Sequence, residues 1–115
     1  MKKTICFDLD NVICRTTNND YKNSKPKKEV IKKINSLYEN GHFIKIFTSR
    51  FMGRSKERIS LAKKRGLKFT KKQLGVWGLK YNQLIFGKPS YDIYIDDKSI
   101  FFNKNWTNKI DNLLK

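Results

Sequence analysis

An apolar run near the beginning of the chain ends in acidic residues, and this limits the possible folds more than any other feature. Residues 4–9 have the pattern of a buried strand, yet Asp8 lies near the end of the run and Asp10 follows directly after it. A buried carboxylate without a partner costs several kcal/mol, so two of them at the end of a strand require a cation or another compensating group. A chemical role for Asp8 and Asp10 is the simplest explanation of this pattern.

The length and the charge limit the kind of protein that this can be. A chain of 115 residues suits one core, so we expect a single domain over residues 1–115. The net charge of +16 attracts phosphorylated, anionic ligands and in principle nucleic acid. Nucleic acid is the less favoured partner, because 21 of the 26 basic residues are lysines scattered among acidic and aromatic residues.

The cysteine pattern and the hydropathy predict the compartment. Cys6 and Cys14 lack the C-x-x-C spacing of a structural zinc site, and the single histidine, His42, is distant from both. The sequence also lacks a secretory signal pattern and the run of about 18 apolar residues that a membrane span needs. We therefore expect reduced thiols, a cytoplasmic location and no membrane partner.

Strand-like and helix-like patterns alternate along the chain, which predicts an α/β fold. We expect strands at residues 4–9, 43–48, 83–86 and 92–95, and helices at residues 26–41, 54–66, 70–77 and 106–114. Pro26 is expected to open the first helix, and residues 70–73 match a capping box. Residues 13–25 are expected to form a flap loop over the end of the first strand. The order predicts a Rossmann-like three-layer α/β/α sandwich with a mostly parallel sheet.

Polar residues follow the predicted strands, where parallel sheets bind their ligands. They are Asp8 and Asp10 after the first strand, Thr48, Ser49 and Arg50 at the second, Lys88 after the third, and Asp96 and Asp97 after the fourth. Together they supply a nucleophile, an acid/base, a hydroxyl donor, a fixed cation and metal ligands, which are the parts that phosphoryl transfer needs. Each motif alone has a simpler explanation as a turn, a cap or a surface lysine. Their joint occurrence in this order favours a site.

In these motifs the chain resembles the haloacid dehalogenase-like (HAD) phosphohydrolase superfamily, whose first motif is Asp-x-Asp-x-Val/Thr on the first strand. Short capless members involved in bacterial capsular or surface polysaccharide biosynthesis look most similar, through residues 47–54 and 87–97. The resemblance covers nearly the whole chain. It implies a HAD-like fold without a cap domain.

The resemblance also implies a role for each motif residue. Asp8 would be the nucleophile, and Asp10 would be the acid/base that protonates the leaving oxygen and then activates water. Thr48 would donate its hydroxyl to a phosphoryl oxygen, and Lys88 would neutralise charge on the same group. The ligands of a Mg²⁺ ion would be Asp8, the carbonyl of Asp10, Asp96 and Asp97, with Asp97 alternatively orienting Lys88. Substrate contacts would come from the Asn11 backbone N–H, Ser49 and Arg50.

The function that these expectations favour is a Mg²⁺-dependent phosphatase acting through an aspartyl-phosphate intermediate. Its substrate would be a small phosphomonoester, either a sugar phosphate or a phosphorylated substituent of a capsular polysaccharide precursor. Two alternatives stay open: a nucleic-acid end phosphatase and a non-catalytic phosphate-binding module. A site without a cap must exclude water through the flap at residues 13–25, a neighbour in a homo-oligomer, or a large substrate.

Overall fold

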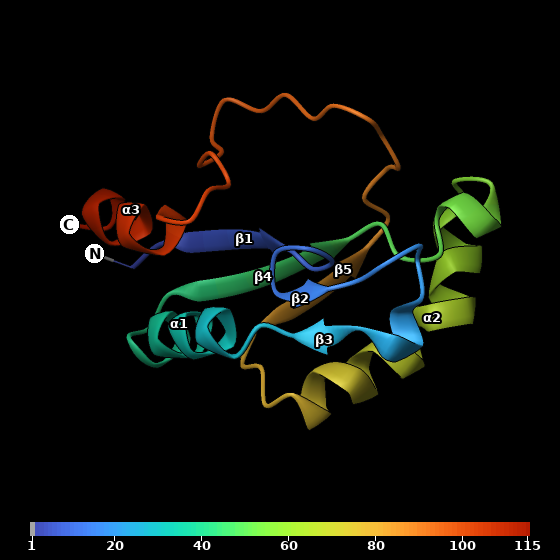
Figure 1. Ribbon diagram of the computed structural model, residues 1–115, viewed down its shortest axis with the longest axis horizontal. Helices are drawn as coiled ribbons and strands as arrows, with labels where there is room; N and C mark the ends of the chain where they lie inside the picture. The colour runs from blue at the N-terminus through green and yellow to red at the C-terminus, as the bar shows by residue number, and fades with distance from the viewer. Residues whose placement is uncertain (1) are drawn as a thin grey trace.

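The computed structural model describes residues 2–115 and shows an α/β fold around a parallel three-stranded sheet (Figure 1). The strand order is β1 (Thr4–Asp8), β4 (Phe43–Thr48) and β5 (Gln83–Phe86), so β4 is central. The helices are α1 (Lys28–Glu39), α2 (Ile59–Val76) and α3 (Trp106–Leu113). These findings confirm the predicted fold class, and no cap domain is inserted among the described residues.

One face of the sheet packs against the core, most deeply at the central strand β4. Ile44, Ile46 and Thr48 alternate along β4 and are each 0% exposed, and Phe7 of β1 lies beside Ile46 in the parallel register. Cys6, which points to the opposite face, is exposed. Period-two alternation places every second side chain on the core face, which is why these stretches form strands. The carboxyl ends of β1, β4 and β5 form one rim of the sheet.

The first helix is shorter than the sequence pattern predicts. Pro26 belongs to a strand, β3 (Lys25–Pro26), instead of opening the helix, and α1 begins at Lys28. Its apolar face is as expected, with Ile31, Ile34 and Leu37 buried at helical spacing. The helix is followed by Gly41 at φ +92°, a left-handed conformation that glycine adopts without strain.

Residues 13–25 are more ordered than the predicted flap loop. β2 (Cys14–Arg15) pairs with β3 in an antiparallel ribbon, and the short helix η1 (Tyr21–Asn23) lies between them. Ile13 and Cys14 are each 0% exposed, and Tyr21 is also buried. The segment is therefore anchored in the core at both ends of the ribbon.

One long helix, α2, replaces the two helices predicted at residues 54–66 and 70–77; the short helix η2 (Gly53–Ser55) precedes it. Gly66, where the first predicted helix ends, lies inside α2. A Cβ added there would come within 2.2 Å of a Phe51 ring carbon, so this glycine permits close packing and does not mark a helix end. None of the described helices, including this longest one, is apolar and long enough to cross a membrane.

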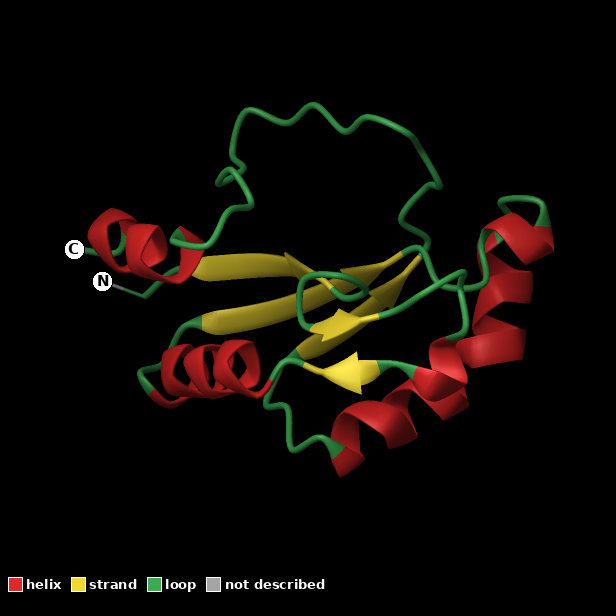
Figure 2. Cartoon of the chain, viewed as in Figure 1, coloured by secondary structure: helices red, strands yellow, loops and turns green. Residues whose placement is uncertain are grey.

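The strand predicted at residues 92–95 does not form. The segment from residue 87 to residue 105 arches away from the sheet as a long loop (Figures 1 and 2). Ile93 and Ile95 are 81% and 92% exposed. Strand propensity is realised only when an edge pairs with the segment. Among the described residues, β1 pairs with β4 alone, so its outer edge is unpaired.

Candidate active site

Several predicted site residues lie at the rim formed by the carboxyl ends of the strands. Asp8 is the last residue of β1, Thr48 is the last residue of β4, and Lys88 lies two residues beyond β5. The backbone N–H of Lys88 donates to the carbonyl of Thr48 at 3.1 Å. The parallel register of the three strands therefore brings residues 40 and 80 positions apart in the sequence to one place.

Asp8 forms a loose ion pair with Lys88. Its Oδ2 lies 3.4 Å from the Lys88 Nζ, longer than the roughly 2.7–2.9 Å of a charge-assisted hydrogen bond. Its Oδ1 accepts a hydrogen bond from the Leu9 backbone N–H at 2.9 Å. Burial raises the pKa of Asp8 above its usual range, because attraction to Lys88 offsets only part of the loss of hydration.

Lys88 is a buried cation beside two aromatic rings. It is 8% exposed, and its Nζ lies 5.3 Å and 4.9 Å from the ring centroids of Tyr91 and Tyr94. Burial disfavours its charge, but contacts with Tyr91 and Asp8 outweigh that effect, so the pKa of Lys88 stands above its ordinary value. The amine therefore supplies a permanent positive charge next to Asp8.

Asp96 lies on the exposed loop, not at the end of a strand as predicted. Its Oδ1 accepts a hydrogen bond from the Lys98 backbone N–H at 2.8 Å, and its Oδ2 accepts one from the Tyr94 hydroxyl at 3.1 Å. These bonds, the Lys98 one foremost, hold the pKa of Asp96 below its usual value. The adjacent Asp97 is exposed.

Asp8, Lys88 and Asp96 all line one hollow of about 600 Å³. We call it the β1-edge hollow, because all five residues of β1 line it. Small-molecule sites commonly measure about 300–1,000 Å³ and combine apolar walls with a few polar groups. The apolar part of this lining includes Ile5, Phe7, Val12, Phe47, Ile100 and Trp106.

Asp10 is compensated by an arginine from the end of β4. The Arg50 Nε lies 2.9 Å from Asp10 Oδ2, and the Arg50 Nη2 lies 2.9 Å from Asp10 Oδ1. The Thr16 hydroxyl donates to the same Oδ1 at 2.5 Å. The two acidic residues of the motif thus have different basic partners, Lys88 for Asp8 and Arg50 for Asp10.

Arg50, predicted as a substrate clamp, is 0% exposed in the structure. Its Nη1 donates to Gln73 Oε1 at 2.6 Å, and its guanidinium carbon lies 4.8 Å from the centroid of the Tyr21 ring. Gln73 donates in turn to the Tyr21 carbonyl at 2.7 Å. A ligand does not reach a guanidinium enclosed in this way, so the arrangement favours a role inside the protein over contact with substrate.

Two other predicted phosphate contacts are engaged within the protein. Thr48 is 0% exposed, and its Oγ1 accepts a hydrogen bond from the Arg50 backbone N–H at 3.1 Å. The Asn11 backbone N–H, which we expected to face a phosphate, donates to the Cys14 carbonyl at 2.7 Å. Ser49 is half-buried between Thr48 and Arg50. The Thr48 hydroxyl and the Asn11 N–H are therefore not open to a ligand in this structure.

The sequence gives little indication that the residues around Asp10 belong to a site. Thr16 and Ser24, whose hydroxyl oxygens lie 2.6 Å apart, sit in a polar stretch that resembles an ordinary loop. Gln73 matches the last position of a capping box, yet it lies inside α2 and contacts Arg50. Short-range patterns predict caps and turns, whereas these contacts join segments far apart in the chain.

The side chains of the β1-edge hollow have donor chemistry that suits Mg²⁺. Asp8 and Asp96 offer carboxylate oxygens, the ligand type that hard cations prefer. Among residues 2–115, no three His, Cys, Asp or Glu side chains are grouped closely enough to hold a metal ion. Mg²⁺ needs only one or two carboxylates, since water and substrate oxygens complete its coordination. Asp8 and Asp96 are therefore the side chains of this hollow whose chemistry fits the ion.

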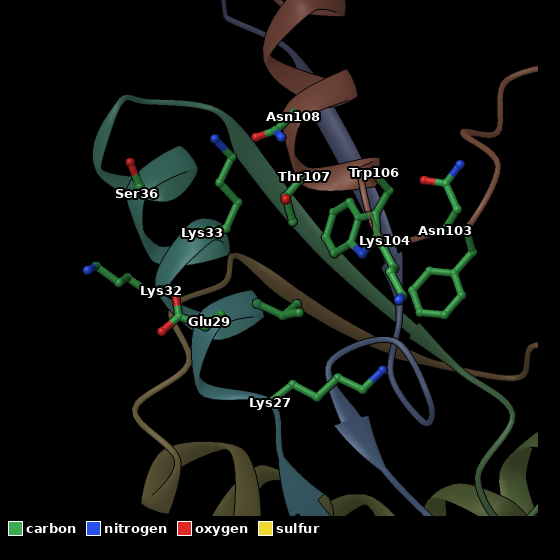
Figure 3. A pocket seen from close by; sticks show the side chains of 12 residues that line it. Lys27, Glu29, Lys32, Lys33, Ser36, Asn103, Lys104, Trp106, Thr107 and Asn108 are labelled. Carbon is green, nitrogen blue, oxygen red and sulfur yellow. The ribbon is translucent and has the colours of Figure 1, made fainter.

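A larger hollow, of about 770 Å³, is lined by residues of α1 and α3 and carries different chemistry (Figure 3). Amines surround it from Lys27, Lys32, Lys33 and Lys104. Glu29 is the one acidic residue of its lining within the described chain. It offers no pair of carboxylates, so the smaller β1-edge hollow is the better candidate for an active site.

Comparison with known proteins supports the fold. No protein-family model matches the sequence, and no curated protein matches it significantly. The crystal structure of a structural-genomics target from Vibrio cholerae is similar to this chain, with a TM-score of 0.80, 24% sequence identity and 100% of each chain covered. At that level of identity the likeness shows a shared fold.

Proposed function

We propose that this protein is a HAD-type phosphatase that hydrolyses a small phosphomonoester. One observation carries the proposal: Asp8, at the carboxyl end of β1, lines a single hollow together with Lys88 and Asp96. The resemblance of the sequence motifs to HAD phosphohydrolases supports the same reaction. The substrate class is a sugar phosphate or a phosphorylated substituent of a capsular polysaccharide precursor. A cytoplasmic location, with Cys6 and Cys14 as free thiols, belongs to this proposal.

The proposed reaction proceeds in two steps. A carboxylate oxygen of Asp8 forms a bond to phosphorus while the bond between phosphorus and the ester oxygen breaks, which gives an aspartyl-phosphate. Asp10 donates a proton to the departing oxygen, so the alcohol leaves neutral. Asp10 then accepts a proton from the water that attacks the aspartyl-phosphate, which releases inorganic phosphate and restores Asp8.

Positive charge at the hollow has to balance the negative charges of Asp8 and the phosphate. Mg²⁺ would be held by Asp8, Asp96 and the carbonyl of Asp10, with Asp97 as a further ligand or as a partner of Lys88, and it would neutralise phosphoryl charge. Lys88 supplies a second positive charge from the protein itself. Its contact with Asp8 at 3.4 Å is loose, so a phosphoryl group could recruit the amine without breaking a strong bond.

The test is a phosphate-release assay over sugar phosphates, amino-alcohol phosphates and nucleotides, with Mg²⁺ or with EDTA. We expect Mg²⁺-dependent release by the wild-type protein and a loss on the order of a thousandfold or more in Asp8→Asn. Asp92→Asn is the matched control, because Asp92 is exposed and does not line the β1-edge hollow. Activity above a few per cent in Asp8→Asn would reject the assignment. Inactivity of the wild type on every ester would favour a phosphate-binding module.

The net charge of +16 supports a nucleic-acid end as the alternative substrate. Such a substrate would bind through several phosphates, so its affinity would fall steeply as salt is raised. A duplex that carries a 3′-phosphate tests this alternative at low salt. If the duplex is neither bound nor dephosphorylated, the alternative is rejected and small esters remain.

A further inference from the structure

The pair formed by Asp10 and Arg50 carries an inference beyond the predicted motif roles. We propose that Arg50 is a positioning residue that fixes the orientation of Asp10 and determines which carboxylate oxygen exchanges the proton with the leaving group and with water. The inference rests on the proposed phosphatase function, because it concerns the acid/base of that reaction.

The hydrogen bonds of Asp10 distinguish its two oxygens. Oδ1 lies 2.5 Å from the Thr16 hydroxyl, 2.9 Å from the Arg50 Nη2 and 3.5 Å from the Cys14 thiol. Oδ2 has a single close donor, the Arg50 Nε at 2.9 Å. A carboxylate oxygen has two lone pairs, so Oδ1 is saturated whereas Oδ2 keeps one free. The side chain is 20% exposed, and Oδ2 is therefore the oxygen that remains available for proton transfer.

The guanidinium of Arg50 has partners other than Asp10. Its Nη1 donates to Gln73 Oε1 at 2.6 Å, its Nη2 lies 3.4 Å from Ser24 Oγ, and its guanidinium stacks on Tyr21. The side chain is 0% exposed, so it does not move away from Asp10 without leaving buried charge unpaired. The position of Arg50 is thus set by α2 and by residues 13–25 together.

The residue after each member of the pair has a left-handed backbone conformation. Asn11, which follows Asp10, has φ +66°, and Phe51, which follows Arg50, has φ +65°. A left-handed conformation at a residue other than glycine costs about 1–2 kcal/mol and persists where the surrounding structure enforces it. Both turns occur directly after the two charged residues. The loops that follow β1 and β4 therefore both turn at the residue next to the ion pair.

Arginine is required here for geometry as well as for charge. Its planar fork meets both oxygens of a carboxylate, whereas a lysine amine is a single point charge that leaves the carboxylate free to rotate. Arg50→Lys therefore retains the charge and removes the bidentate contact. Arg50→Met removes both. Arg54 provides a matched control, because its guanidinium also stacks on the Tyr21 ring, at 5.0 Å, but is not among the donors to Asp10.

The experiment compares two phosphate esters that differ in their need for an acid. p-Nitrophenyl phosphate has a good leaving group, whereas glycerol phosphate has an alkoxide that must be protonated as it departs. We expect Arg50→Lys and Arg50→Met to lower kcat/KM on glycerol phosphate by about a hundredfold and on p-nitrophenyl phosphate by less than about tenfold. Arg54→Met should leave the ratio of the two values unchanged. Circular dichroism and thermal unfolding identify variants that fold.

The outcomes separate this inference from the proposed function. If the wild-type protein hydrolyses none of the esters tested, the phosphatase proposal is overturned, and the role of Arg50 with it. An active wild type, with Arg50 variants that lose the same factor on both esters, overturns the positioning role alone. The positioning role is also overturned if Arg54→Met changes the ratio as much as Arg50→Met. If Arg50→Met does not fold, Arg50→Lys gives the ratio.

Discussion

Asp10 and Asp8 lie two residues apart in the sequence, yet their surroundings in the structure differ sharply. Asp10 is held by an arginine fork and a threonine hydroxyl, with Arg50 at 0% exposure. Asp8 has one backbone hydrogen bond and a lysine at 3.4 Å. We call Asp10, Arg50, Tyr21 and Gln73 the Asp10 side, and Asp8, Lys88 and Asp96 the Asp8 side.

This contrast indicates that the Asp10 side has a fixed geometry before a ligand binds, whereas the Asp8 side can rearrange when one does. A network of buried hydrogen bonds such as that around Arg50 is rigid, because moving one member leaves others unpaired. A loose pair exchanges partners at small cost, and on the Asp8 side it faces a hollow of about 600 Å³. The Asp10 side therefore fixes geometry, and the Asp8 side is the part that receives the phosphate in the proposed function.

Thiol labelling should separate the two sides most clearly. Cys14 belongs to the Asp10 network and is 0% exposed, whereas Cys6 lines the β1-edge hollow and is exposed. A disulfide reagent should modify Cys6 faster than Cys14 by a factor on the order of a thousand, because Cys14 must await unfolding. Burial raises the pKa of the Cys6 thiol, so its labelling rate should still increase as the pH rises above about 8. Cys6→Ser and Cys14→Ser assign the two phases, and equal rates would contradict the contrast.

Disrupting the Asp10 side should cost more stability than any change on the Asp8 side. We expect Arg50→Met to lower the free energy of unfolding by about 3 kcal/mol, because Asp10 loses its buried partner. Arg54→Met, at an exposed position, should cost less than about 1 kcal/mol. Urea denaturation measures both values. A loss in Arg50→Met no larger than in Arg54→Met would show that the pair contributes little.

Removing the loose pair on the Asp8 side should matter less. Lys88→Met keeps the aliphatic stem next to Tyr91 and Tyr94 and removes the ammonium, with its loose contact of 3.4 Å to Asp8 and its approach to the two rings. Because Asp8 stays partly exposed and the pair is long, we expect the free energy of unfolding to fall by about 1–2 kcal/mol, less than in Arg50→Met. The same urea experiment measures this change. A loss as large as that in Arg50→Met would mean that the two sides are equally rigid.

The exposed loop that carries Asp96 should tolerate substitution best. Ile93→Ser and Ile95→Ser remove side chains that are 81% and 92% exposed, so each should change the free energy of unfolding by no more than about 0.5 kcal/mol. Ile44→Ser, in the core of β4, serves as the opposite extreme. A loss above about 2 kcal/mol in either loop variant would show that the segment packs against the body in solution. The unpaired edge of β1 is a surface to which such a strand could add.

The sequence predicted those elements whose periodicity coincides with local burial. The strand over residues 43–48 matches β4 because its alternating residues face the core, and α1 keeps its predicted apolar face. The predictions for residues 54–77 and 92–95 are wrong for tertiary reasons. Gly66 marks close packing against Phe51 instead of a helix end, and residues 92–95 have strand propensity but no paired edge.

The candidate site divides in the same way. Parallel strand order predicts that Asp8, Lys88 and Asp96 approach one another, and all three line one hollow, although Asp96 reaches it from a loop. The partnership of Asp10 with Arg50 was beyond prediction, because the two residues are 40 positions apart and a buried arginine leaves no local pattern. The need for a cation or another compensating partner could be predicted from the motif, but the identity of that partner could not.

The position of β4 between β1 and β5 determines how the amides of the sheet exchange their hydrogens. Backbone amides of the central strand face neighbours on both sides and exchange only when the sheet opens. β1 is bonded along one edge, so its outward-facing amides exchange with solvent while its inward-facing amides stay protected. That outward edge borders the hollow that Asp8 and Asp96 share. A ligand bound in the hollow should therefore slow the hydrogen exchange of these amides.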